Sequence, residues 1–175
     1  MGSREPVRDQ QTVTKDGEQI AALPVGAVFR PTVTQVDDRG SLWELLDPRW
    51  GAHPDPIVYA YSVTWRPGKI KAWAIHRNHD DRYAVLFGEL LVVMYDVRPE
   101  SPTHGMVSEL VLSEYRRGLL TIPVGVWHGT QNIGTTDAAV VNFPTEPYDH
   151  EHPDKYRLPV GTPEIPYTFP TSSGW

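Results

Sequence analysis

The sequence predicts an all-β domain built as a small antiparallel barrel, and three observations support this. Short runs rich in β-branched and aromatic residues recur from Phe29 onward, turn residues separate them, and helical periods are scarce. Seventeen prolines and fourteen glycines distributed among these runs favour a barrel or sandwich over a helical or βαβ architecture. The predicted strands cover residues 32–36, 57–65, 83–87, 90–95, 107–112, 119–122 and 138–143.

The two ends of the chain differ from this strand-rich middle. Residues 1–20 are polar and show no apolar period, which predicts a flexible N-terminal arm. Residues 21–175 are expected to form a single domain, because a chain of 175 residues has the length of one domain. Within it, residues 144–170 are rich in proline and tyrosine and include the apolar Ile165, so we expect an extended C-terminal tail wrapped over the barrel.

The composition limits the classes of partner. The chain contains no cysteine, which excludes disulfides and thiolate metal sites and fits a reducing cytoplasm. Its net charge of -6 and its scattered Lys and Arg side chains suggest no basic face for a nucleic acid. No apolar stretch approaches the roughly 20 residues that a membrane span needs. We therefore expect a cytoplasmic protein that binds neither nucleic acid nor membrane.

The segment from Gly118 to Asn132 is the most informative part of the chain. It reads as a strand, a tight Pro-x-Gly turn and a second strand that carries His128. Because Pro123 fixes φ and Gly125 permits a positive φ, the chain reverses and presents His128 toward the barrel interior. The spacing Pro-x-Gly-x-x-His-x-x-x-Asn resembles the second cupin motif. This resemblance implies a cupin barrel, that is, a double-stranded β-helix or jelly roll, followed by the extended C-terminal tail.

An upstream segment matches the frame of the first cupin motif between Gly68 and Gly88. His76 occupies the second histidine position of that motif, whereas Ala74 stands at the first and Asp81 replaces the usual glutamate. Residues two apart share one face of a strand, so Ala74 and His76 are expected to point into the barrel together.

These substitutions bear on whether the site holds a metal. His76, Asp81 and His128 form a 2-His-1-carboxylate set that is chemically adequate for iron or another divalent ion. However, aspartate must reach about one methylene further than glutamate, and metal distances tolerate only a few tenths of an ångström. Arg82, next to Asp81, offers a structural ion pair as another interpretation. The preferred prediction is a site with no metal or other cofactor, and one divalent metal is the alternative.

A more particular resemblance covers about residues 29–169. The chain resembles the dTDP-4-dehydrorhamnose 3,5-epimerase family of metal-free cupins, as a divergent member. The matching segments are Asp37-Asp-Arg39-Gly40 with Glu44, Gly88 to Arg98, Ser101-Pro-Thr-His-Gly105, Ile122-Pro-x-Gly125 with His128-Gly129, and Asn142 to Tyr148, and the tail at 151–159 is like that of the family's shorter relatives.

The resemblance implies proton abstraction next to a ketone. In that chemistry a histidine acts as base, a cation stabilises the enolate oxygen and a tyrosine returns the proton. The base histidine of the family falls on Ala74 here, and its lysine falls on Asp81. The predicted catalytic set is therefore His76 as a displaced base, Asp81 as its partner or as the base itself, the retained His128, and Tyr148 as the acid.

Four residues are predicted to bind the substrate. The family's nucleotide contacts fall on Arg39 and Glu44, its arginine at the site is replaced by Lys71, and His79 lies in a predicted loop at the barrel mouth. Simple alternation places Lys71 on the face opposite Ala74, so its participation requires a β-bulge or the start of the strand near Ala72. Family members pair as homodimers by exchanging an N-terminal strand, which implies the same for this chain.

The predicted function is that of an isomerase of carbohydrate biosynthesis. It is a nucleotide-sugar epimerase or ketoisomerase that acts on a dTDP-4-keto-6-deoxyhexose-like substrate. Two alternatives stay open: a divalent-metal cupin enzyme using His76, Asp81 and His128, and a non-catalytic cupin that binds a nucleotide sugar.

Overall fold

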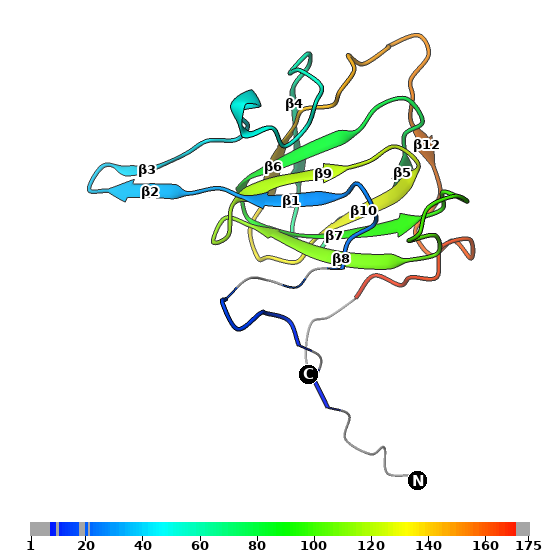
Figure 1. Cartoon of the computed structure of the whole chain (residues 1–175), viewed down its shortest axis with the longest axis horizontal. Helices are drawn as coiled ribbons and strands as arrows, with labels where there is room; N and C mark the ends of the chain where they lie inside the picture. The colour runs from blue at the N-terminus through cyan, green and yellow to red at the C-terminus, as the bar shows by residue number, and fades with distance from the viewer. Residues whose placement is uncertain (1–7, 10, 18–19, 21, 171–175) are drawn as a thin grey trace.

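The computed structural model describes residues 8–9, 11–17, 20 and 22–170, and this part of the chain is almost entirely strand and loop (Figure 1). Its one helical element is the 3-10 turn η1 (Pro48–Trp50), and no helix in these ranges is long and apolar enough to cross a membrane. The strands are β1 (Val28–Pro31), β2 (Thr34–Asp37), β3 (Gly40–Trp43), β4 (Tyr61–Trp65), β5 (Ile70–Ile75), β6 (Asp81–Phe87), β7 (Glu89–Asp96), β8 (Val107–Ser113), β9 (Gly118–Ile122), β10 (Val126–Asn132), β11 (Ala138–Asn142) and β12 (Tyr156–Arg157).

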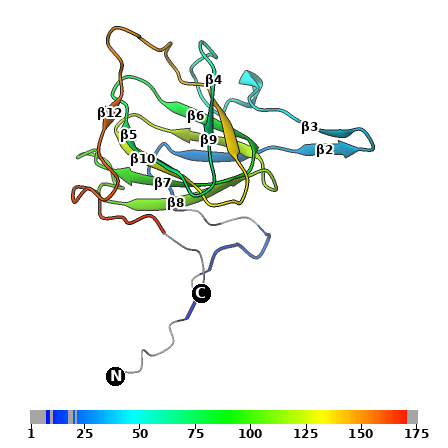
Figure 2. The same cartoon turned by 180° about the vertical axis from the view of Figure 1, so that it is seen from behind.

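Two five-stranded antiparallel sheets form the barrel (Figures 1 and 2). One sheet has the order β1-β9-β6-β11-β4 and the other has the order β12-β5-β10-β7-β8. Most neighbouring strands are distant in the sequence, as β6 and β11 are, so long-range pairing holds each sheet together. This arrangement confirms the predicted all-β jelly roll.

Two strand predictions differ from the structure, and strand β5 is absent from the predicted strands. The predicted strand at 32–36 is replaced by β1, which ends at Pro31, and by β2, which begins at Thr34. The predicted strand at 57–65 begins only at Tyr61, so residues 57–60 are not part of the sheet. Strand β5 was recognised through its motif, not through its composition.

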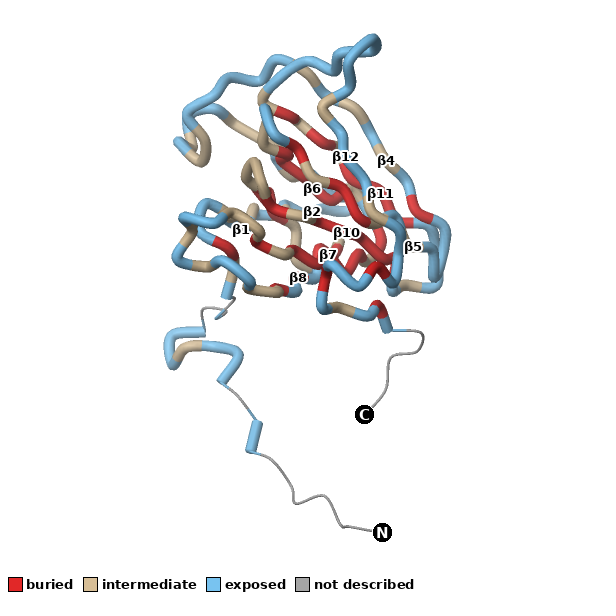
Figure 3. Tube along the Cα trace, turned by 90° about the vertical axis from the view of Figure 1, so that its right-hand side faces the viewer, coloured by how far each residue is buried: buried red, intermediate tan, exposed pale blue. Residues whose placement is uncertain are grey.

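Two apolar clusters stabilise the barrel, and the second involves the tail. The first fills the space between the sheets with buried side chains of β6 to β11 and of Trp65 (Figure 3). The second lies on the outer face of β5 and β7, where Trp73 is 0% exposed beneath Ile165 and Phe169. The rings of Trp73 and Phe169 are 5.2 Å apart. The C-terminal tail therefore packs on the barrel, as predicted, and its β12 extends one sheet.

A bulge in β5 sets the direction of its side chains. His128 pairs with Ala74 and Thr130 pairs with Lys71, so two residues of β5, Ala72 and Trp73, oppose the single residue Gly129 of β10 between these pairs. This bulge lies at Ala72, where the sequence required a bulge or a strand start, and it places Lys71 and Ala74 on the same face. Gly129 allows the two strands to approach, because a Cβ there would lie only 2.8 Å from the Cβ of Ala72.

Two predictions concern parts of the chain outside this barrel. The hairpin β2–β3 projects away from the sheets and carries the exposed Arg39 at its tip (Figure 1). The predicted flexible arm at 1–20 lies largely outside the described residues, so it stays a prediction. The same holds for the single-domain boundaries.

Candidate active site

Three buried polar side chains meet at one end of the barrel. His76 directly follows β5, Asp81 begins β6 and His128 lies on β10, and their exposed fractions are 6%, 1% and 4%. The turn at Gly125 adopts φ +76 and its N–H donates to the carbonyl of His76 at 2.9 Å, which ties the two cupin motifs together. The fold therefore brings together the three residues that the two cupin motifs predicted to share a site.

Both histidines present the same nitrogen to Asp81. Nδ1 of His76 hydrogen-bonds to the carbonyl of Asp154, and Nδ1 of His128 lies 3.3 Å from the carbonyl of Val126. A carbonyl oxygen only accepts, so each Nδ1 carries a proton and each Nε2 is turned inward. The two Nε2 atoms each lie 3.3 Å from Oδ2 of Asp81.

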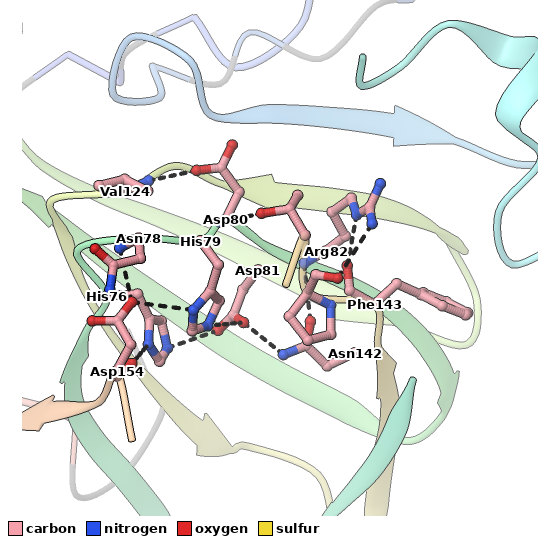
Figure 4. A network of polar contacts seen from close by, with 12 residues as sticks. His76, Asn78, His79, Asp80, Asp81, Arg82, Val124, Asn142, Phe143 and Asp154 are labelled. Atoms are coloured by element: carbon pink, nitrogen blue, oxygen red, sulfur yellow. Dashed lines mark hydrogen bonds and ion pairs between the residues drawn. The ribbon is translucent and has the colours of Figure 1, made fainter. Parts of the chain in front are cut away.

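The other oxygen of Asp81 is held by the barrel. Nδ2 of Asn142 donates to Oδ1 at 2.7 Å (Figure 4). The same Nδ2 also donates to the hydroxyl of Tyr61 at 2.9 Å. Burial alone would raise the pKa of Asp81, but His128 and His76 offset this and hold that pKa well below its usual value. Burial alone would lower the pKa of His76, whereas its contact with the Asp81 carboxylate raises it overall. Asp81 is thus the fixed negative charge of the site.

Arg82 does not pair with Asp81, so the predicted alternative of an ion pair between them is wrong. Successive residues of a strand point to opposite faces, and the guanidinium of Arg82 lies on the other side of β6. There it donates to the carbonyls of Asp55, Pro56 and Phe143 at 2.6–2.9 Å. Its role is to hold the preceding loops against the barrel.

His79 lies beside His76 and has a partner of its own. The two rings are 4.1 Å apart, and Figure 4 shows them side by side. Nδ1 of His79 lies 3.2 Å from Oδ2 of Asp154, while its Nε2 is 3.7 Å from Oδ1 of Asp81. Burial and then the neighbouring His76 lower the pKa of His79. Asp154 itself is held by the backbone N–H groups of Arg77 and Asn78.

A small pocket of about 20 Å³ lies beside these histidines at the barrel mouth. Tyr148 lines it together with His76 and His79, so three of the predicted site residues share one space. The remaining lining residues are Tyr61, Pro144, Glu146, Asp154 and Lys155. Burial and then Asp81 raise the pKa of Tyr61 to about 12, which keeps this phenol protonated.

Positively charged side chains lie near the mouth of the barrel, and two of them, Lys155 and Arg157, were not predicted from the sequence. Arg157 of β12 pairs with Ala74, and Lys155 lines the pocket. Burial, the charge of Arg157 and, more weakly, that of Lys71 lower the pKa of Lys155. Nζ of Lys71 lies 5.0 Å from the centre of the Trp65 ring. No local signal marked Lys155 or Asp154, because β12 brings them to the site from far along the chain.

Two predicted binding residues lie elsewhere. Arg39 is on the projecting hairpin, where its guanidinium pairs with Asp37. Glu44 follows β3 and lines a separate groove with Arg30 and Trp50. Neither residue lines the pocket of its own chain.

Several known proteins are similar to this chain in sequence and fold. The model of the dTDP-4-dehydrorhamnose 3,5-epimerase family matches residues 27–172. The probable low-salt glycan biosynthesis epimerase Agl13 of Haloferax volcanii is 35% identical over 132 residues, which cover 74% of this chain and 84% of that protein. The spore coat polysaccharide biosynthesis protein SpsL of Bacillus subtilis is 32% identical over 148 residues, which cover 83% and 96%.

A solved structure agrees with these sequence matches. The dTDP sugar isomerase from Desulfovibrio desulfuricans superposes with a TM-score of 0.77 at 28% identity. The superposition covers 83% of this chain and 91% of that one.

Proposed function

Because this chain belongs to the dTDP-4-dehydrorhamnose 3,5-epimerase family, we propose that it is a nucleotide-sugar epimerase or ketoisomerase acting on a dTDP-4-keto-6-deoxyhexose or a close analogue. One observation carries the proposal: His79 and Tyr148 line the same pocket, beside the buried Asp81 cluster. The carbonyl of such a sugar acidifies the hydrogens on adjacent carbons. A base can therefore remove one of them, and an acid can return a proton to the enolate.

His79 is the base in this proposal, in place of the predicted His76. Nδ1 of His76 hydrogen-bonds to the carbonyl of Asp154 and its Nε2 lies 3.3 Å from Asp81, whereas Nε2 of His79 is farther from Asp81, at 3.7 Å, and is the more available nitrogen. Nδ1 of His79 lies 3.2 Å from the Asp154 carboxylate, an arrangement that keeps the proton on Nδ1 and leaves Nε2 as the proton acceptor. In this proposal the Asp154–His79 pair takes the place of the family's base histidine, whose position is occupied here by Ala74.

Tyr148 is the acid in this proposal. Its side chain lines the pocket and is 43% exposed, so a bound sugar can reach the hydroxyl. Lys71, Lys155 and Arg157 supply positive charge for the diphosphate of the nucleotide. The sugar is then held with its ketone toward the buried cluster.

The nucleotide site extends to a second copy of the chain in this proposal. The hairpin β2–β3 that carries Arg39 projects from the barrel and exposes the apolar side chains of Val36 and Leu42. Exposed apolar side chains on a projecting element favour burial against a partner. We therefore propose a homodimer in which Arg39 and Glu44 of each copy contact the nucleotide bound by the other. With no cysteine in the chain, the cytoplasm is its proposed location.

Product analysis tests this function. Wild-type protein is incubated with a dTDP-4-keto-6-deoxyhexose, and the recovered sugar is analysed by NMR for inversion at C3 or C5 or for migration of the ketone. We expect turnover in the wild type and a loss of at least about 100-fold in His79→Gln, because a positioned general base contributes that much. His104→Gln, a change at an exposed histidine outside the pocket, is the matched control and should retain full activity.

The Tyr148→Phe variant separates the two proton transfers. It should lose product formation while the base still removes and restores a proton on one face. Binding of the nucleotide sugar without any product in the wild type would reject the enzyme and leave the non-catalytic alternative.

A further inference from the structure

We propose that His76, Asp81 and His128 bind one divalent transition-metal ion at the base of the pocket. Nε2 of each histidine and Oδ2 of the aspartate converge, and all three lie within 4.8 Å of one another. This inference departs from the prediction of a site without cofactor. The binding rests on geometry alone, whereas the role assigned to the ion below rests on the proposed function.

The distances around Asp81 favour an ion over direct hydrogen bonds. Charge-assisted N–H···O bonds are about 2.7–2.9 Å long. The two Nε2 atoms are each 3.3 Å from Oδ2, although the same carboxylate accepts from Asn142 at 2.7 Å. Two ligands that each lie about 2.0–2.1 Å from a metal are separated by roughly 3.0–3.4 Å at adjacent coordination positions. The two nitrogen–oxygen distances are therefore those of adjacent ligands in a coordination shell, and the third distance is within 4.8 Å.

The surroundings of the three residues also match those of metal ligands. Histidines that bind metals usually donate the other ring N–H to a carbonyl or carboxylate, which fixes the tautomer and the ring orientation. His76 does so to the carbonyl of Asp154, and Nδ1 of His128 faces the carbonyl of Val126 at the longer distance of 3.3 Å. Asn142 fixes the third ligand by its hydrogen bond to Asp81. Each proposed ligand therefore has a partner that holds it in place.

The donor set indicates the class of ion. Two imidazoles and one carboxylate favour Fe²⁺, Zn²⁺ or a similar first-row ion over Mg²⁺ or Ca²⁺, which prefer oxygen ligands. A second group, His76, His79 and Asp154, also has the donor atoms close together. That group is the weaker candidate, because the Asp154 carboxylate already accepts two backbone N–H groups.

The proposed ion would supply the charge that this chain has lost. The position of the family's enolate-stabilising lysine is occupied here by Asp81, which has the opposite sign. Asp81 is the one carboxylate among the three proposed ligands, so a bound divalent ion would give the cluster a net positive charge. When bound, the ion would act as a Lewis acid toward the ketone oxygen of the sugar. His79 and Tyr148 would retain their roles beside it.

Cobalt titration tests the site without any assay of activity. The full chain is treated with a chelator, dialysed, and titrated with Co²⁺ while the visible absorption of the ion and the heat of binding are measured. We expect one Co²⁺ per chain and a loss of affinity of at least about 100-fold in Asp81→Asn and in His128→Gln. His104→Gln is again the matched control. In the wild type, ¹⁵N NMR during Zn²⁺ addition should shift Nε2 of His76 and His128, so the assignment does not depend on whether a variant folds.

Each result decides one question. No stoichiometric Co²⁺ binding, or NMR shifts confined to the exposed histidines, would overturn the metal site. Stoichiometric Co²⁺ binding without turnover of any keto sugar would keep the metal site and reject the proposed function. Full turnover by protein that binds no Co²⁺ would reject the metal site and keep the proposed function.

Discussion

Asp81 and Asp96 are both buried carboxylates, but their surroundings differ in a way that separates function from structure. Asp96 is 0% exposed, and its partners lie at full hydrogen-bonding distance: Arg98 Nη2 at 2.7 Å and the hydroxyls of Ser101 and Thr103 at 2.6 Å. Asp81 is 1% exposed, but its histidine neighbours lie at 3.3–3.7 Å. Asp96 therefore accepts short hydrogen bonds from all of these neighbours, whereas the histidines around Asp81 lie farther from its oxygens.

The difference follows from what each carboxylate connects. Asp96 joins the end of β7 to the loop at 97–106, and Arg98 and Thr103 extend the network to the backbone of Val25. Such a network stabilises one backbone arrangement and leaves no room for a ligand. Around Asp81 the donors are imidazoles, which can lose or gain a proton or bind an ion. A buried charge with loosely placed neighbours is therefore the better indicator of a functional site.

The largest expected effect is on activity. Asp81→Asn should reduce turnover of the keto sugar by about 100-fold or more, because it removes the negative charge that organises the site. Asp96→Asn should leave turnover within about twofold of the wild type, since Asp96 contacts no pocket residue. Steady-state assays of the two purified variants measure both values. Equal losses of turnover would contradict the assignment of Asp81 to function and of Asp96 to structure.

The second effect is on stability and runs the other way. Asp96→Asn should lower the free energy of unfolding by about 2–3 kcal/mol, because it replaces hydrogen bonds to a charged group. Asp81→Asn should have a smaller effect, about 1 kcal/mol, because the new amide keeps the bond from Asn142 although it removes the carboxylate that His128 and His76 stabilise. Urea unfolding at pH 7 measures both values. A large loss in Asp81→Asn would mean that this carboxylate is structural as well.

A smaller effect depends on pH. Burial would raise the pKa of Asp96, but Arg98, Ser101 and Thr103 lower it well below its usual range. A folded-state pKa below the unfolded value of about 3.9 stabilises the fold above that value, and the contribution is lost as pH falls toward the folded-state pKa. The stability difference between wild type and Asp96→Asn should be constant from pH 5 to 8 and shrink below about pH 4. Asp137→Asn, at an exposed position, should show no such trend.

The smallest effect tests a single bond of the closed network. Thr103→Val removes one hydroxyl donor from Asp96 and one acceptor from the N–H of Val25, at nearly unchanged volume. We expect a loss of about 1–2 kcal/mol and wild-type turnover. Thermal unfolding measured beside Thr135→Val, an exposed control, shows whether this bond matters; no loss would indicate that the network is less cooperative than proposed.

Much of the fold and part of the site could be predicted from local sequence. Strand runs and the two motif frames predicted a barrel in which His76, Asp81 and His128 meet, because alternation and a Pro-x-Gly turn act over a few residues. The bulge expected near Ala72 is also present. Local patterns carry this information because each depends on neighbours within one strand or turn.

Other features of the site depend on contacts between distant segments. Asp154 and His76 are 78 residues apart in the sequence, and their contact exists because β12 pairs with β5. No spacing rule predicts that pairing, so the partner of His79 was missed. Sequence alternation also cannot show which ring nitrogen of His76 faces Asp81, and this decides whether His76 is a base or a ligand.

Isotope exchange with solvent tests the central claim, that this barrel mouth removes a proton next to a ketone, most directly. Wild-type protein is incubated with a dTDP-4-keto-6-deoxyhexose in D₂O, and the deuterium at C3 and C5 of the recovered sugar is measured by mass spectrometry and NMR. We expect deuterium at one or both carbons at a rate far above that of the protein-free sugar, and its loss in His79→Gln. No deuterium above the protein-free level in the presence of bound sugar would contradict it.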